Sequence, residues 1–217
     1  MPFDFAQGIV RTIESMSLFK KQENIEGAPP ASSSKMALKF FLELVQVVAI
    51  SLAIIIPVRY FLVQPFYVKG ASMEPNFFDH EYLIIDELSY RFNQPSRGDI
   101  VVFHYPNDPK SYFIKRVVGL PGETVEIADG QVKIYNDKYP NGIVLDEHAY
   151  LDDVYTSQTV RVTLKADQYY VLGDNRSSSL DSRYFGPIFD KVVVGRVWLR
   201  GWPLDSWKIF NAPTYNL

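Results

Sequence analysis

The sequence predicts a mainly antiparallel β domain behind one N-terminal transmembrane helix. Three observations predict it: one long apolar run, short β-branched and aromatic runs recurring after it, and turn residues between those runs. The chain has 217 residues. At roughly 100–200 residues per domain, that length allows one ordinary domain plus an anchor or tail.

Composition excludes several classes of protein. Hydrophobic residues make up 47% and charged residues 22%, so the chain can bury a core and is not disordered throughout. The formal net charge of −3 gives no electrostatic basis for binding nucleic acid. Without cysteine there is no disulfide framework, thiolate zinc site or cysteine nucleophile, and three scattered histidines without an HExxH motif argue against a zinc hydrolase.

The first segment, residues 1–36, is polar and ends in a Gly-, Pro- and Ser-rich stretch with linker composition. Five apolar residues in it fall at roughly helical spacing: Phe3, Phe5, Ile9, Ile13 and Met16. The pattern fits a short amphipathic helix or plain disorder, and the sequence leaves both open.

Residues 37–60 are expected to form the anchor helix. The apolar run 40–58 contains Glu43 as its only charge, and at ~1.5 Å per residue it comes close to the ~30 Å hydrocarbon core of a membrane. A buried core helix would be amphipathic, whereas this run is apolar nearly all round. A cleaved signal peptide would have a short charged region before it and small residues after it, and this run has neither.

Lysines before the anchor indicate its orientation. Four lie on the N-terminal side, against two basic residues beyond the run: Lys20, Lys21, Lys35 and Lys39 against Arg59 and Lys69. By the positive-inside rule, the N-terminus is expected in the cytoplasm and residues 61–217 outside it, in a single-pass protein of the cell membrane.

Residues 61–217 are expected to form strands separated by turns. The predicted strands are 82–85, 100–105, 112–118, 124–127, 132–135, 160–164, 169–172 and 192–199. Asp129-Gly130 between two of them predicts a tight hairpin. No strand alternates with a long helical pattern, which argues against a parallel sheet. Residues 123–168 are taken as a less typical insertion or cap.

Ser72 is the first candidate for chemistry. It lies about a dozen residues past the apolar run, between Gly70 and Pro75, which favour a tight turn that would expose the hydroxyl. The motif is not the G-x-S-x-G elbow, because Glu74 occupies the place of the second glycine. Taken alone, Ser72 is better explained as a turn or cap residue than as a nucleophile.

Lys115 and Arg116 are adjacent cations in the predicted strand 112–118, so alternation directs them to opposite faces. At least one of them therefore lies among apolar neighbours. Burial lowers the pKa of a lysine, which is what a lysine needs to act as a general base near neutral pH. A lysine that reaches water from an edge strand is the alternative.

The third segment, residues 173–186, is bounded by glycines and rich in short hydrogen-bonding side chains. Hydroxyl groups in it are able to orient a neutral amine, and Asp181 is a partner for either Arg183 or Arg116. A solvated loop with an Asx-turn is the alternative.

These segments, in this order, resemble the boxes of type I signal peptidases, which are membrane-anchored Ser/Lys leader peptidases. Ser72-Met73 with Pro75 resembles the nucleophile box, and residues 115–123 resemble the lysine box. The sequence 97–103 resembles the box between them, and residues 173–186 resemble the last box. The match spans roughly residues 64–199. All boxes in order behind one anchor form a specific pattern.

The resemblance implies an endopeptidase that removes signal peptides from secretory preproteins after an Ala-x-Ala-like motif. Carried over, Ser72 is the nucleophile, Lys115 the general base, and Ser179 orients the lysine amine. Asp181, Arg183 and Arg116 become structural residues, and the Ser72 backbone N–H forms part of the oxyanion hole. Some members have a serine where this chain has Gly70, which leaves the second oxyanion donor unassigned.

The resemblance further implies no cofactor and no metal, preproteins and the lipid bilayer as partners, and a monomer. Five residues near Ser72 are expected to face the substrate or the membrane: Phe66, Tyr67, Met73, Phe77 and Phe78. For some of these rings, a place in the core is the alternative. The alternative function is a catalytically silent, membrane-tethered binding protein of the same fold.

Overall fold

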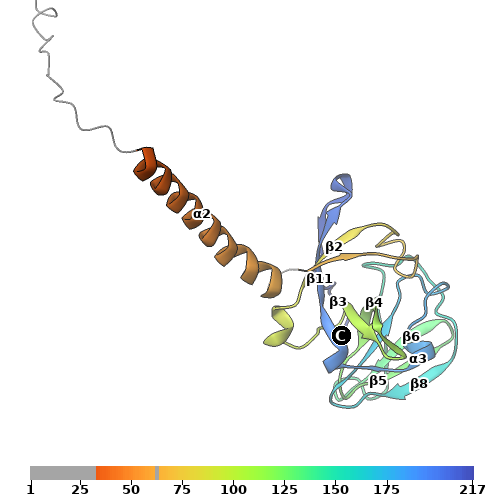
Figure 1. The fold of residues 1–217 in the computed structure, drawn as a ribbon. Helices are drawn as coiled ribbons and strands as arrows, with labels where there is room; N and C mark the ends of the chain where they lie inside the picture. Colours follow the sequence, from red (N-terminus) through yellow and green to blue (C-terminus); the bar gives the residue numbers. More distant parts are fainter. Residues whose placement is uncertain (1–32, 62–63) are drawn as a thin grey trace, which may run out of the picture. The chain divides into compact units, whose positions relative to one another are not determined.

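The computed structural model describes residues 33–61 and 64–217, so the expectations for residues 1–32 lie outside the described part. Helix α2 runs over Ser33–Phe61 (Figure 1). Within it, Met36–Ile56 has a mean hydropathy of 2.2, is long and apolar enough to cross a membrane, and has no buried residue. The expected apolar helix is therefore present. It is not the buried core helix of a soluble domain.

The main body of the chain is built on an eight-stranded antiparallel sheet (Figure 1). Its strands follow the order β1-β2-β11-β3-β4-β9-β10, with β12 paired to β11. Their bounds are β1 Gln64–Tyr67, β2 Tyr82–Asp86, β3 Ile100–Tyr105, β4 Asp108–Gly119, β9 Gln168–Leu172, β10 Ile188–Phe189, β11 Val193–Trp202 and β12 Lys208–Ile209. Strands distant in sequence lie side by side, since β11 pairs with both β2 and β3.

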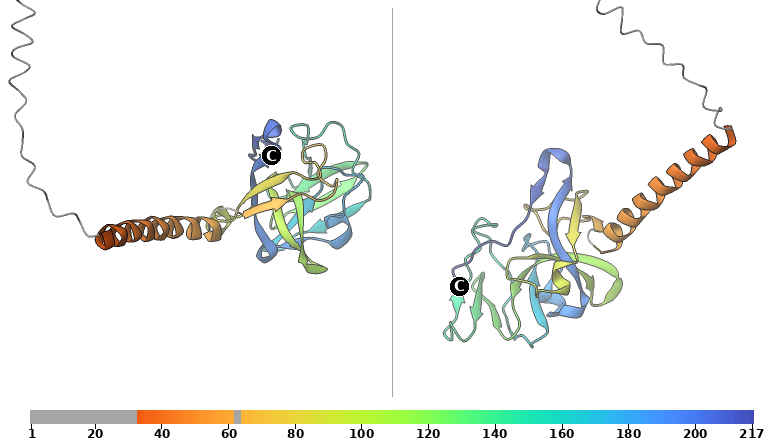
Figure 2. Two further views of the ribbon diagram at one scale, coloured as in Figure 1. Left: turned by 45° about the horizontal axis from the view of Figure 1, so that its top comes forward. Right: turned by 90° about the vertical axis from the view of Figure 1, so that its left-hand side faces the viewer.

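A second, four-stranded antiparallel sheet has the order β7-β6-β5-β8. It consists of β5 Thr124–Ala128, β6 Gln131–Tyr135, β7 Ile143–Val144 and β8 Val160–Thr163. We call this sheet the cap sheet. All its strands fall within residues 123–168, the segment expected to be an insertion or cap, and Figure 2 shows it as a separate layer of the β domain. That this segment is an insertion stays a prediction.

Short helices complete the β domain. One turn of α-helix, α3, spans Ser182–Phe185, and three 3₁₀ turns span Ser89–Arg91 (η1), Asp190–Val192 (η2) and Leu204–Ser206 (η3). The antiparallel β class expected from the sequence is confirmed, because none of the described strands is joined to a parallel neighbour.

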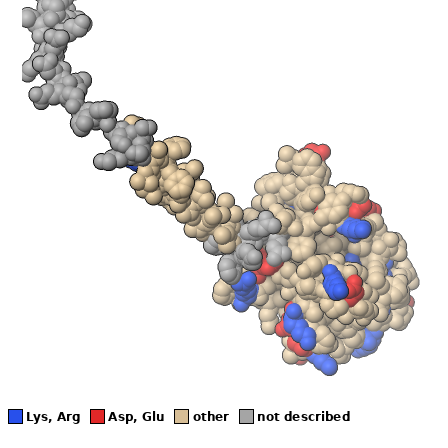
Figure 3. Space-filling model, in the orientation of Figure 1, with Lys and Arg blue, Asp and Glu red and all other residues tan. Residues whose placement is uncertain are grey.

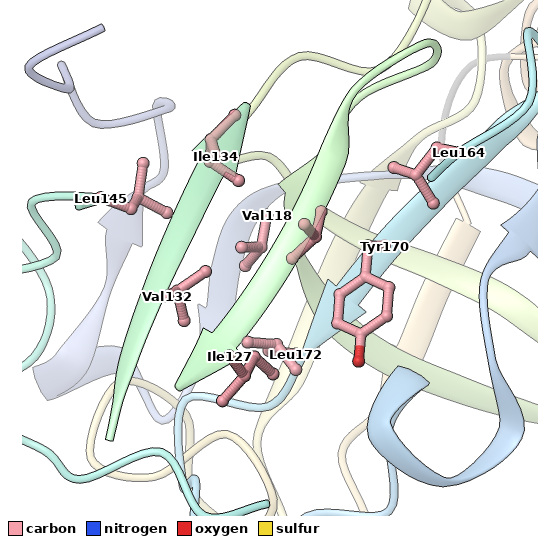
Figure 4. Close-up of a cluster of buried hydrophobic side chains, with 9 residues drawn as sticks. Val118, Ile127, Val132, Ile134, Leu145, Leu164, Tyr170 and Leu172 are labelled. Atoms are coloured by element: carbon pink, nitrogen blue, oxygen red, sulfur yellow. The ribbon is translucent and has the colours of Figure 1, made fainter. Parts of the chain in front are cut away.

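A hydrophobic cluster joins the two sheets. Val118 of β4 and Tyr170 and Leu172 of β9 come from the main sheet, and they pack against side chains of the cap sheet and its flanking loops (Figure 4). Those partners are Val125, Ile127, Val132, Ile134, Leu145 and Leu164. Because all nine are buried, the cap sheet is fixed against the strand that carries Lys115.

The hairpin expected at Asp129-Gly130 is confirmed. Asp129 has φ +52° and Gly130 has φ +79°, and β5 and β6 pair directly across them. Two consecutive positive φ angles match the right-handed twist of the flanking strands, which is why Asp-Gly is favoured there.

Candidate active site

Ser72 lies in a tight turn between β1 and β2. The turn opens at Gly70, whose φ of +91° favours glycine, and closes with hydrogen bonds from the backbone N–H groups of Asn76 and Phe77 to the Met73 carbonyl. The Gly70 N–H donates to Asp79 Oδ1 at 2.9 Å, which ties the start of the turn to its end. Ser72 is half-buried, so its hydroxyl is held at an accessible place.

Lys115 lies on β4, whose two neighbours fix it. On one edge of β4, Lys115 pairs with Val101 of β3. On the other edge, β4 pairs with β9 from Arg116 onward. The Nζ atom of Lys115 donates to Ser72 Oγ at 2.7 Å and to the Ile114 carbonyl at 2.7 Å. Two residues 43 positions apart therefore meet within hydrogen-bond distance.

The environment of Lys115 lowers the pKa of its amine. Only 3% of the residue is exposed, and this burial lowers its pKa from 10.5 to about 8. The carboxylates of Asp181 and Asp174 act in the opposite direction and limit the shift. Of the two alternatives for Lys115, a buried lysine or one that reaches water from an edge strand, the structure shows the buried one. A substantial fraction of it is neutral at mildly alkaline pH.

Arg116 points to the opposite side of β4 and is paired with Asp174. Its Nε and Nη2 atoms donate to the two Asp174 oxygens at 2.8 and 2.6 Å, and Nη1 donates to the Gly98 carbonyl at 3.0 Å. Both side chains are buried. Asp174 is the partner that sequence reasoning missed. Its position directly after Gly173, at the end of β9, was the available signal.

Asp181 pairs with Arg183 rather than with Arg116. Its two carboxylate oxygens accept from Arg183 Nε and Nη2, both at 2.8 Å, and Oδ2 also accepts from the Gly173 N–H at 3.0 Å. Asp181 is the N-cap of α3, with Oδ1 accepting from the Arg183 N–H. The segment after β9, residues 173–186, is called the last loop below. These hydrogen bonds hold it internally and tie Asp181 to Gly173 at the end of β9.

Asn175 holds the turn that carries Ser72. Its backbone N–H donates to the Ser72 carbonyl at 3.1 Å and its side-chain Nδ2 donates to the Ala71 carbonyl at 3.1 Å. Sequence reasoning named this residue only as part of the last box. Its two contacts dock the last loop directly onto the backbone of Ser72.

Ser179 lies next to the candidate dyad but is not bonded to it. It is 8% exposed, and its Oγ is buried without a hydrogen-bond partner in the described part of the chain. The expected hydrogen bond to the Lys115 amine is not formed, and Lys115 Nζ donates to Ser72 and Ile114. Gly173 shows how closely the groups are packed, since a Cβ there would lie against Ser179 Oγ and 2.5 Å from the Ser72 carbonyl.

A cavity of about 390 Å³ opens beside Ser72 and Lys115. Apart from these two residues its lining is mostly apolar and aromatic, and it includes Phe66, Tyr67, Val68, Leu83, Val102, Tyr112, Phe113, Ile114 and Leu180. Such a concave, mainly apolar lining with a few polar groups is typical of ligand sites.

The expectation that Met73 and Phe77 face the substrate or the membrane is wrong. Met73 is 1% exposed and Phe77 is not exposed, and both pack in the core beside Val68 and Leu83. They are four residues apart in a helix-like turn, so both point to the same inner side. Phe66 and Tyr67 line the cavity, and Phe78 is half exposed.

The charged side chains on the face shown in Figure 3 form small separate groups of both signs. On that face no broad basic stripe covers the β domain.

Comparison with known proteins points to one family. Residues 41–202 match the family described as signal peptidase, peptidase S26. The chain is similar to a signal peptidase I of Leptolyngbya laminosa, with 36% identity over 86% of this chain and 92% of that relative. A probable signal peptidase I-2 of Synechocystis sp. is 38% identical over 76% of this chain and 74% of its own length.

A signal peptidase IB of Staphylococcus aureus is 31% identical over 78% of this chain and 94% of that relative. Among solved structures, a crystal structure of a signal peptidase I from Enterococcus faecalis V583 has 33% identity, covering 48% of this chain and 97% of that one, at a TM-score of 0.40. The range matched by the family, residues 41–202, includes Ser72, Lys115 and residues 173–186.

Proposed function

Since the chain belongs to the signal peptidase family, whose members are serine endopeptidases, we propose that Ser72 and Lys115 form the dyad with which it cuts signal peptides from preproteins. One observation carries this proposal. The Lys115 amine is buried, has a lowered pKa and lies 2.7 Å from the Ser72 hydroxyl. A nucleophile and a base within hydrogen-bond reach are what covalent catalysis requires.

In the acylation step, neutral Lys115 accepts the Ser72 hydroxyl proton. With one proton removed, the amine has a lone pair, so the hydrogen bond reverses and Oγ–H becomes the donor. Oγ then attacks the scissile carbonyl carbon, and the tetrahedral intermediate collapses when the C–N bond breaks. The Lys115 ammonium returns the proton to the leaving amine, which leaves the signal peptide as an ester on Ser72.

In the deacylation step, Lys115 is neutral again and takes a proton from water. The resulting hydroxide adds to the ester carbonyl, and breaking the C–Oγ bond releases the signal peptide carboxyl group. The proton on Lys115 returns to Ser72 Oγ. The side chains therefore start and end in the same state, and one water is consumed for each bond cut.

The Ser72 backbone N–H is proposed as an oxyanion donor. Within the described part of the chain it makes no hydrogen bond, so it is available to a developing negative charge. Gly70 does not supply a second donor, because its side chain has no hydroxyl and its N–H is bonded to Asp79. Removing a single oxyanion donor typically costs a factor of about 10²–10³ in rate.

The cavity beside the dyad is proposed to receive small apolar side chains before the cut. Its walls include the apolar side chains of Val68, Val102 and Ile114, while Lys69 and Ser111 are the polar residues of the lining besides the dyad. An Ala-x-Ala-like motif at the end of a signal peptide fits that lining. Phe66 and Tyr67 line the same cavity and are proposed to contact the peptide beside the cut.

The apolar helix anchors the chain to a membrane. We propose that residues 1–36 lie in the cytoplasm and the β domain on the other side of a cell membrane, because four lysines precede the apolar run 40–58 and only Arg59 and Lys69 follow it closely. The partners are then secretory preproteins and the lipid bilayer, with the protein acting as a monomer.

Cleavage of a preprotein tests the function. Full-length protein in detergent is incubated with a preprotein that carries an Ala-x-Ala site, beside a Ser72→Ala variant, and the product termini are mapped by mass spectrometry. A cut after the second alanine, absent with the variant, supports the proposal. No cut by well-folded protein, combined with binding of the preprotein, would favour a silent tethered binding protein.

A further inference from the structure

Asn76 joins the turn that carries Ser72 to the network behind Lys115. Its side-chain Nδ2 donates two hydrogen bonds, one to Asp174 Oδ2 at 2.9 Å and one to the Tyr150 carbonyl at 2.8 Å. These partners are 98 and 74 positions away in the chain. Both amide protons are therefore used across long sequence distances, which is unusual for a residue that only closes a turn.

The carboxylate that Asn76 contacts is the one that holds Arg116. Arg116 Nη2 donates to the same Asp174 Oδ2 at 2.6 Å, and Arg116 follows Lys115 directly on β4. Asp174 also favours the charged form of Lys115. A displacement of Asp174 would therefore change both the position of β4 and the proton affinity of the Lys115 amine.

The Tyr150 contact brings the loop after β7 into the same network. The Arg116 guanidinium lies 3.9 Å from the centre of the Tyr150 ring, and the Tyr150 hydroxyl donates to Glu147, which is paired with Arg176 of the last loop. Arg176 Nε in turn donates to the Gly173 carbonyl. These contacts connect four segments: the Ser72 turn, β4, the last loop and the loop after β7.

From this geometry we infer that Asn76 is a positioning residue, which keeps the Ser72 turn in register with Lys115 through the Asp174 carboxylate. Asn76 does not touch the reacting atoms. Its backbone carbonyl is 3.4 Å from Arg200 Nη1. The charged groups in this network are Asp174 with Arg116, Glu147 with Arg176 and Glu81 with Arg200, and Asp181 acts on Lys115 together with Asp174. This inference rests on the proposed function of the dyad.

Two substitutions test the inference in the full-length protein in detergent. Asn76→Leu keeps a similar volume and removes both donors, so kcat on a peptide with an Ala-x-Ala site should fall by about tenfold or more while KM changes less than threefold. Asn76→Asp keeps the shape and adds a carboxylate beside Asp174. An added negative charge favours the ammonium form, so the acidic limb of the kcat–pH profile should move upward by about half a unit or more.

Asn136→Leu is the matched control. Asn136 Nδ2 donates at 2.9 Å to Glu123, which is paired with Arg97, so the control breaks an equivalent amide–carboxylate contact away from the dyad. It should alter the melting temperature without moving kcat or the pH profile.

Unchanged kcat and an unmoved acidic limb in both Asn76 variants would overturn the inference. So would a loss of kcat in Asn136→Leu as large as in Asn76→Leu. If Asn76→Leu does not fold, the pH profile of Asn76→Asp decides alone. The proposed function is tested separately by wild-type cleavage that depends on Ser72. That result does not depend on how the Asn76 variants behave, so the two proposals can fail independently.

Discussion

Ser72 and Lys115 are 43 positions apart in the chain, yet their Oγ and Nζ atoms lie 2.7 Å from each other. The Ser72 turn and β4 are separate elements, joined here through the last loop. Asn175 bonds to the turn, Asp174 bonds to Arg116 of β4, and both belong to the segment after β9. The last loop therefore contacts both the turn that carries Ser72 and the strand that carries Lys115.

Activity should depend on the neutral form of Lys115. Because burial lowers its pKa to about 8, kcat should rise with pH to a half-maximum near pH 8 and then reach a plateau. Measuring kcat on a peptide substrate between pH 6 and 10 checks this. A kcat that stays constant from pH 6 to 9 would contradict the role of Lys115 as the base.

Replacing Lys115 by Met should stabilise the fold at neutral pH. The pKa of Lys115 is lower in the folded than in the unfolded chain, so the unfolded chain binds more protons and the wild type gains stability as pH rises from about 8 to about 10.5. The advantage of Lys115→Met should be up to about 3 kcal/mol at pH 7 and should shrink towards pH 10. Urea unfolding of both proteins at several pH values measures it, and an advantage that is independent of pH would refute it.

Gly173→Ala should impair both activity and stability. Its Cβ would collide with Ser179 Oγ and lie 2.5 Å from the Ser72 carbonyl, so the last loop would have to move away from the nucleophile turn. We expect a loss of about 1–3 kcal/mol in stability and at least ~100-fold in kcat/KM.

Gly201→Ala is the control for this effect, since the nearest atoms to its Cβ would be 3.9 Å away. Thermal melts and peptide cleavage of the two variants should differ clearly. Equal behaviour would show that the close packing around Gly173 has no functional consequence.

Removing Arg116 should cost far more stability than removing an exposed arginine. Arg116→Ala would leave the buried Asp174 carboxylate without its main partner, at an expected cost of about 3–5 kcal/mol. The exposed Arg161, paired with Glu126, should cost about 0–1 kcal/mol when replaced by Ala. Urea unfolding measures both, and similar losses would contradict the structural role assigned to Arg116.

Local patterns in the sequence predict much of the fold. All eight expected strands form, because their β-branched and aromatic runs are bounded by clear turn residues. The strands β1, β7, β10 and β12 were missed. They are two to four residues long, and β1 contains Pro65, so periodicity had too few positions to detect them.

The site was harder to predict because its contacts are long-range. The order of the boxes suggested the proposed dyad, but the partner of Asp181 was left open between Arg183 and Arg116. The pairing of Arg116 with Asp174 depends on how β4 and β9 meet. Met73 and Phe77 were misplaced because closeness to Ser72 in sequence does not tell which side of a turn faces the core. Neither does sequence show that the Ser179 hydroxyl lies beside the dyad without bonding to Lys115.

The most direct test of the dyad is the single-turnover rate of preprotein cleavage by Lys115→Ala, compared with wild type under enzyme excess. We expect a loss by a factor on the order of 10²–10⁴, with the melting temperature no lower than that of wild type at pH 7. A Lys115→Ala protein that cuts the same bond at most of the wild-type rate would contradict it.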